Sequence, residues 1–76
     1  MVNEPKLNGF YFWNTDLYQI SEIESTVCVL KSIPDERIAN SGYALNGFNN
    51  REWREALEHE IPEQYRKNLL QNLIIW

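Results

Sequence analysis

The sequence predicts a small single domain of the α+β class, in which an N-terminal β-hairpin or three-stranded antiparallel meander packs on two C-terminal α-helices. Three observations predict this fold. Two runs of strand-forming residues, "FYFW" and "LYQI", flank the turn-forming "NTD". A third run, "TVCVLKSI", is rich in β-branched residues. The last third of the chain carries apolar side chains at helical spacing.

Length and composition limit the chain to one thin core. It has 76 residues, of which 43% are hydrophobic and 13% aromatic. A domain of this size buries about 60% of the surface that its unfolded chain exposes. Residues 1–8 combine turn formers and charges without a periodic apolar face, so we expect a flexible N-terminal tail. The single α+β domain is expected over residues 9–76.

The first hairpin is expected to turn through a three-residue loop, residues 14–16. Asp16 at its third position tolerates a left-handed backbone better than most residues. This register places Trp13 opposite Leu17 and Phe10 opposite Ile20, and successive side chains alternate between the two faces. The face predicted to be buried carries Phe10, Phe12, Tyr18 and Ile20. The face left for a partner carries Tyr11, Trp13, Leu17 and Gln19.

Residues 26–33 are predicted to form a third strand after a polar turn. A competing interpretation remains, because apolar residues at positions 20, 23, 27 and 30 also fit one amphipathic helix over residues 20–33. The strand is favoured, since the serines, threonine and valines of this stretch are mediocre helix formers.

Helices are predicted over most of the C-terminal half. Pro34 begins "PDERIA" as a short helix that Gly42 interrupts, and "NGFNN" is a loop by composition. Asn49 and Glu52 form a capping pair for a helix that runs to about residue 60. Its apolar stripe is Trp53, Ala56, Leu57 and Ile61. A second helix starts at Pro62, with a shared face of Tyr65, Leu69, Leu73 and Trp76.

Catalytic and metal-binding patterns are not found in the sequence. His59 and Cys28 are the only residues of their types, and the three glycines form no phosphate-binding loop. We therefore predict no enzyme activity, no cofactor and no metal site. A single cysteine precludes an intrachain disulfide, and no run approaches the roughly 18 apolar residues of a membrane span, so we expect a cytoplasmic protein.

Net charge separates the two remaining classes of function. The formal charge is −4, whereas proteins that bind nucleic acids usually carry a basic excess. Nucleic-acid binding is kept as the alternative, through the hairpin aromatics or through the C-terminal helix pair. The helix pair would present Arg66, Lys67 and Asn68.

Surplus aromatic residues favour a protein-binding module that acts as a regulator, inhibitor, antitoxin-like protein or accessory subunit. The surplus over one thin core is Tyr11, Trp13, Tyr43, Phe48 and Trp76. Trp and Tyr most often anchor interfaces, so Tyr11, Trp13 and Leu17 are the candidate partner-binding residues. Glu60 joins them, because it lies in the predicted apolar stripe and must be exposed or meet a cation, which a partner can supply. The partner is another protein, which the surface acids would steer if it is basic, or a second copy of this chain.

Overall fold

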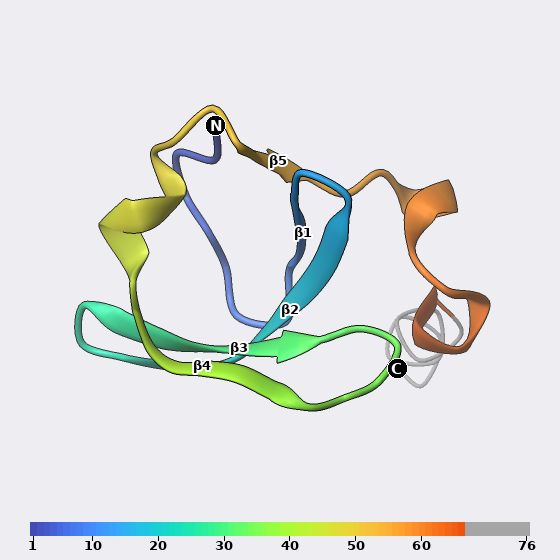
Figure 1. Cartoon of the computed structure of the whole chain (residues 1–76), viewed down its shortest axis with the longest axis horizontal. Coiled ribbons are helices and arrows are strands. Elements are labelled where there is room, and N and C mark those ends of the chain that lie inside the picture. Colours follow the sequence, from blue (N-terminus) through green and yellow to red (C-terminus); the bar gives the residue numbers. More distant parts are fainter. Residues whose placement is uncertain (67–76) are drawn as a thin grey trace, which may run out of the picture.

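The computed structural model describes residues 1–66, which form one five-stranded antiparallel sheet with strand order β4-β3-β2-β1-β5 (Figure 1). The strands are β1 Phe10–Trp13, β2 Asp16–Glu24, β3 Val27–Ser32, β4 Ile38–Ala44 and β5 Trp53–Glu55. Two 3₁₀ turns, η1 Leu45–Phe48 and η2 Glu58–Glu60, flank β5, and residues 63–66 are helical. Among the described residues, no helix is long and apolar enough to cross a membrane.

The predicted packing of a hairpin or meander on two C-terminal helices is wrong, because the stretch expected to form the first helix contains β5. Trp53 pairs with Trp13 across the edge of β1, and this pairing outweighs the helical spacing. Asn50 also accepts a hydrogen bond from the Glu52 N–H (2.9 Å) in a local turn that competes with a helical start. The second predicted helix is described only to Arg66. Its remaining face, and Lys67 with Asn68, lie outside the described residues.

The predicted helix after Pro34 is also wrong, because residues 38–44 form β4. Glu36 adopts a left-handed backbone (φ 60°), and its N–H donates to the Ser32 carbonyl at 2.7 Å. These contacts make a turn that joins β3 to β4. The third predicted strand is confirmed as β3, and the competing helix over residues 20–33 is wrong.

The register of the first hairpin differs by one residue from the predicted one. The turn has two residues, since Asn14 adopts φ 55° and Trp13 pairs with Asp16. A slip of one residue moves each side chain of a strand to the other face relative to its partner. Tyr11 therefore lies opposite Tyr18, and the predicted division of the aromatics between the two faces is wrong.

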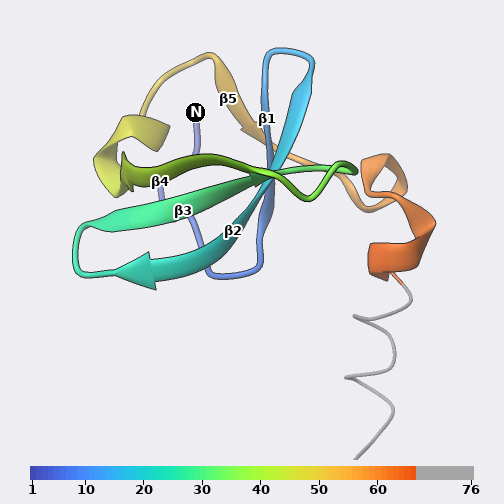
Figure 2. The ribbon, with the colours of Figure 1, turned by 60° about the horizontal axis from the view of Figure 1, so that its bottom comes forward.

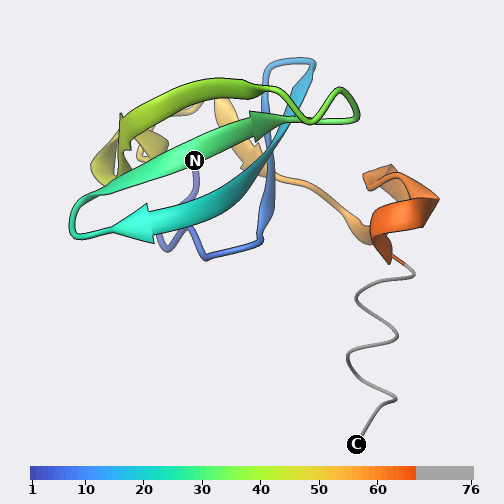
Figure 3. The same cartoon turned by 90° about the horizontal axis from the view of Figure 1, so that it is seen from below.

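The sheet curls strongly, so that its two end strands face each other. β2 pairs with β1 through its first half and with β3 along most of its length, and a register shift after Ile20 interrupts the second pairing. Figures 2 and 3 show β1 and β5 standing across the ribbon formed by β2, β3 and β4. The Trp53 indole N–H of β5 reaches Tyr43 Oη of β4 at 3.0 Å, although these strands are farthest apart in the strand order.

Two hydrophobic clusters result. The inner cluster consists of Val2, Tyr11, Ile20, Cys28, Leu30, Phe48 and Trp53. The outer cluster has a buried centre of Phe10, Leu17 and Ile33, with Phe12, Ala56, Ile61 and Tyr65 packed against it. The structure places part of the expected N-terminal tail in the inner cluster, because Val2 is buried there and its N–H donates to the Phe48 carbonyl at 3.1 Å.

Candidate functional site

An aromatic groove of about 210 Å³ opens beside the inner cluster. All five strands of the curled sheet contribute to its lining, and β4 contributes the most residues. We define the aromatic groove by its lining residues, which are Trp13, Tyr18, Leu30, Ala39, Asn40, Tyr43 and Trp53. Rings that are distant in sequence meet here because the curl brings β4 toward β5.

Trp53 is the buried base of the aromatic groove, and three half-buried rings surround it. The Trp53 ring is edge-on to Trp13, with ring centroids 5.3 Å apart. Tyr18 and Tyr43 each lie 5.8 Å from Trp53, and all three pairs cross at 62–63°. Such edge-to-face pairs contribute about 0.5–1.5 kcal/mol beyond the area that they bury. The rings are therefore held in place by one another.

Hydrogen bonds fix the ring of Tyr43. Its Oη accepts from Trp53 Nε1–H at 3.0 Å and donates to the Gly47 carbonyl at 3.1 Å. A Cβ at position 47 would lie 2.8 Å from Cζ and Oη of Tyr43, so a larger residue there would displace the Tyr43 ring from this position. The wall of the groove formed by Tyr43 is thus oriented before any partner arrives.

Three polar groups on the groove lining remain available to a partner. Within residues 1–66, Trp13 Nε1–H and Tyr18 Oη have no hydrogen-bond partner. Asn40 uses its Oδ1 to accept from the Gly42 N–H at 2.9 Å, which leaves its side-chain NH₂ available. The groove therefore offers two side-chain donors, from Trp13 and Asn40, and a Tyr18 hydroxyl that can donate or accept.

A carboxylate borders the aromatic groove at the hairpin turn. Asp16 lies directly opposite Trp13 in the β1–β2 register, so both side chains emerge on the same face, with their Cβ atoms roughly 5 Å apart. Asp16 is exposed. The ion pairs among residues 1–66 are Lys31–Glu36 and Arg54–Glu60, so neither of them engages Asp16.

The three hairpin residues predicted to bind a partner, Tyr11, Trp13 and Leu17, lie in different environments. Tyr11 is 2% exposed, packs edge-on against Phe48 and accepts a hydrogen bond from the Lys6 N–H at 2.8 Å. Burial is the main cause that raises the pKa of Tyr11. Leu17 is buried in the outer cluster, so of the three only Trp13 lies in the aromatic groove.

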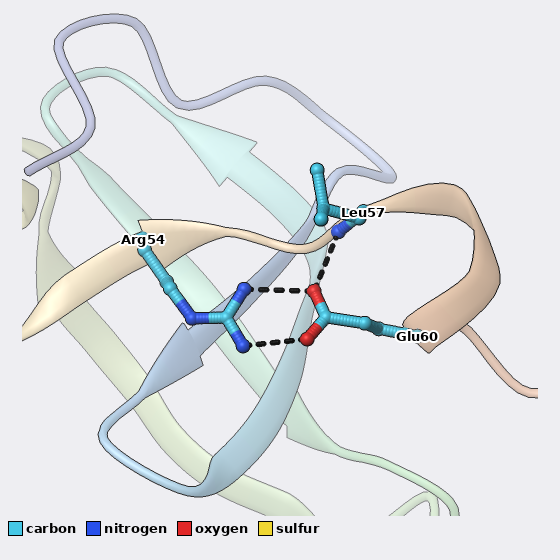
Figure 4. Close-up of polar contacts among 3 residues, drawn as sticks. All are labelled: Arg54, Leu57 and Glu60. Atoms are coloured by element: carbon cyan, nitrogen blue, oxygen red, sulfur yellow. Dashed lines mark hydrogen bonds and ion pairs between the residues drawn. The ribbon is translucent and has the colours of Figure 1, made fainter.

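Glu60 meets a cation of its own chain. Its carboxylate accepts two hydrogen bonds from Arg54, at 2.7 and 2.6 Å, and one from the Leu57 N–H at 2.9 Å (Figure 4). The hydrogen bonds from Arg54 are the main cause that lowers the pKa of Glu60 to about 2. The same guanidinium lies 4.5 Å from the centre of the Phe12 ring. Glu60 thus ties the segment after β5 to the sheet.

Sequence reasoning missed three of the four groove rings. Tyr18 was assigned to a buried face by the slipped register, and Trp53 to a helix stripe. Tyr43 was identified only as a surplus aromatic residue. The run "REWRE" around Trp53 has a single apolar residue and no alternation, so it gave no local signal for the edge strand that brings Trp53 beside Trp13.

The other reactive side chains form no second site. Cys28 is buried, and burial raises the pKa of its thiol. His59 is exposed on η2. In the described part of the chain, no group of three or more His, Cys, Asp or Glu side chains could hold a metal ion.

Comparison with known protein families, with curated proteins and with solved structures gives no match to this chain. The groove is therefore interpreted from its own geometry.

Proposed function

We propose that this protein is a small protein-binding module, acting as a regulator, inhibitor, antitoxin-like protein or accessory subunit without catalysis, and that the aromatic groove is its binding surface. The observation that carries the proposal is the set of three half-buried rings around the buried Trp53. Trp and Tyr are the residues that most often dominate binding energy at protein interfaces.

Rigidity of the groove supports the same proposal. Edge-to-face contacts and the Trp53–Tyr43–Gly47 hydrogen bonds hold the rings. Binding costs free energy when side chains lose rotamer freedom, and rings that are already fixed lose little of it. A partner that covers them gains apolar contact at a low ordering cost.

Charge favours a protein partner over a nucleic acid. Asp16 places a carboxylate beside the groove, where it would repel phosphates. Lys31 and Arg54 are each paired with a carboxylate of the same chain. The overall charge of −4 would instead speed encounter with a basic partner. A cytoplasmic location is part of the proposal and suits the free thiol of Cys28.

The test uses two neighbouring substitutions on β4. Ala39→Arg puts a long side chain on the groove lining, whereas Ile38→Arg adds the same charge at an exposed position outside the lining. A partner is captured from cells of the native host with the wild-type chain, identified and purified. We expect Ala39→Arg to weaken its binding by about tenfold or more and Ile38→Arg to leave it nearly unchanged.

A partner that binds the Ala39→Arg chain as tightly as the wild type would overturn the proposal. Light scattering on both variants separates a foreign partner from a second copy of this chain. If the captured partner is the chain itself, the wild type is a dimer and Ala39→Arg is a monomer.

A further inference from the structure

We infer that the aromatic groove takes an extended, proline-rich peptide segment with a basic residue next to Asp16. This inference rests on the proposed function and specifies the class of partner. Its basis is the combination of crossed rings, unpaired donors and one flanking carboxylate in a groove of about 210 Å³.

The size of the groove favours a narrow segment. Pockets for drug-sized ligands usually have volumes of about 300–1,000 Å³, which is more than this groove provides. Trp13, Tyr18 and Tyr43 each lie edge-on to the Trp53 ring at 62–63°, so the groove presents apolar ring surface on three sides of Trp53. Aromatic-lined grooves bind the proline rings of peptides in the polyproline II conformation. Such peptides are already extended before they bind.

The hydrogen-bonding groups of the groove select for proline. The available groups are Trp13 Nε1–H, the Tyr18 hydroxyl and the Asn40 NH₂. Tyr43 Oη already accepts from Trp53 and Asn40 Oδ1 from Gly42, so among the lining side chains the Tyr18 hydroxyl is left as the unoccupied acceptor. Proline residues present carbonyl acceptors and have no N–H to satisfy. An ordinary peptide would bury N–H donors that find few acceptors here, at a cost of about 1–3 kcal/mol each.

Addition of a strand to β4 is a less suitable mode for the same peptide. β4 is an end strand of the sheet, but its pairing with β3 shifts register twice, after Cys28 and after Leu30. Irregular pairing of this kind twists an edge and hinders regular pairing with another strand. The groove side of β4, which carries Ala39, Asn40 and Tyr43, is the better surface.

Charge complementarity adds the basic residue. Asp16 is exposed at the hairpin end of the groove, and the two ion pairs among residues 1–66 do not include it. An arginine or lysine at one end of the bound segment would pair with this carboxylate. A surface pair contributes little to affinity but sets the direction in which the peptide lies.

The test is a titration of the full chain with synthetic peptides of nine prolines that carry one arginine at either end. We expect NMR shifts at the Trp13 indole N–H, Tyr18 and the Asn40 side chain, and one arginine position should bind more tightly than the other. A matched peptide with alanine in place of every proline should bind at least about tenfold more weakly. Replacing arginine by glutamate should weaken binding severalfold, and Asp16→Asn should remove that difference.

Equal binding of the proline and alanine peptides, or no shift at the groove, would overturn the inference. The Ala39→Arg chain provides the matched groove control and Ile38→Arg the matched surface control. If Ala39→Arg abolishes binding of the native partner but the proline peptides do not bind, the partner class is wrong and the proposed function stands. If the native partner binds the Ala39→Arg chain normally, the proposed function itself fails.

Discussion

The inner and outer clusters lie on opposite faces of the same β1–β2 hairpin, yet their side chains are secured in different ways. The inner cluster surrounds Phe48, which is fully buried, and the polar atoms of Trp53, Tyr43 and Tyr11 are hydrogen-bonded. The outer cluster depends on the segment after β5. Tyr65 Oη and Arg66 Nε there are buried without a hydrogen-bond partner among the described residues. The comparison teaches that the more fully hydrogen-bonded face also carries the aromatic groove.

Removal of the Phe48 ring should give the largest effect and tests whether the inner cluster is the main source of stability. Phe48 contacts the rings of Tyr11, Tyr43 and Trp53, with centroids 4.4–5.4 Å away. Phe48→Ala should lower the free energy of unfolding by about 3–5 kcal/mol, measured by urea denaturation, because the cavity cannot close. A loss below about 1 kcal/mol would contradict the importance given to the inner cluster.

The corresponding truncation in the outer cluster should cost less. Ile33 is buried there beside Phe10 and Leu17. We expect Ile33→Ala to lower the free energy of unfolding by about 2–3 kcal/mol, and to leave the NMR signals of the groove rings nearly unchanged. If Ile33→Ala costs more than Phe48→Ala, or shifts the signal of the Trp13 indole N–H strongly, the two clusters are not independent.

A single hydroxyl tests the hydrogen bonds of the inner face. Tyr43→Phe leaves the buried Trp53 N–H without its acceptor, so the free energy of unfolding should fall by about 1–2 kcal/mol. Tyr18→Phe is the matched control on the same groove, because the Tyr18 hydroxyl has no partner within residues 1–66, and its effect should be near zero. Equal effects in urea denaturation would show that the Trp53–Tyr43 bond does not stabilise the groove.

Local sequence signals sufficed for the existence of the β-hairpin and of β3 but not for the hairpin register. Of the aromatic residues counted as surplus to one thin core, Tyr11 and Phe48 are buried in the inner cluster, whereas Trp13 and Tyr43 line the aromatic groove. The same local signals failed for Trp53. Its four-residue spacing from Leu57 and Ile61 matches one face of a helix, although Trp53 lies in a strand. The interaction that makes this segment a strand is the pairing of β5 with β1. In it Trp53 lies opposite Trp13, which is forty residues earlier in the sequence. Periodicity within a short window carries no information about such a partner.

The groove could not be assembled from the sequence for a related reason. Its faces depend on the length of one turn, and the left-handed Asn14 makes that turn two residues long instead of three. A difference of one residue exchanges Tyr18 and Leu17 between faces. The predicted site therefore contained Leu17, which is buried in the outer cluster, and omitted Tyr18, which lines the groove.

Acid should weaken the attachment of the outer cluster through Glu60, and this is the smallest expected effect. In the folded chain the pKa of Glu60 is lowered from 4.5 to about 2, chiefly by the hydrogen bonds from Arg54. The unfolded chain thus binds a proton at Glu60 at a higher pH than the folded chain does. The stabilisation is complete above about pH 4.5 and is lost as the pH falls toward about 2.

Stability measured by urea denaturation between these values should fall less steeply for Glu60→Gln than for the wild type. Glu58→Gln, at an exposed position outside the two ion pairs of residues 1–66, should keep the wild-type slope. Identical slopes for Glu60→Gln and the wild type would show that the Arg54 clamp adds nothing to the outer face.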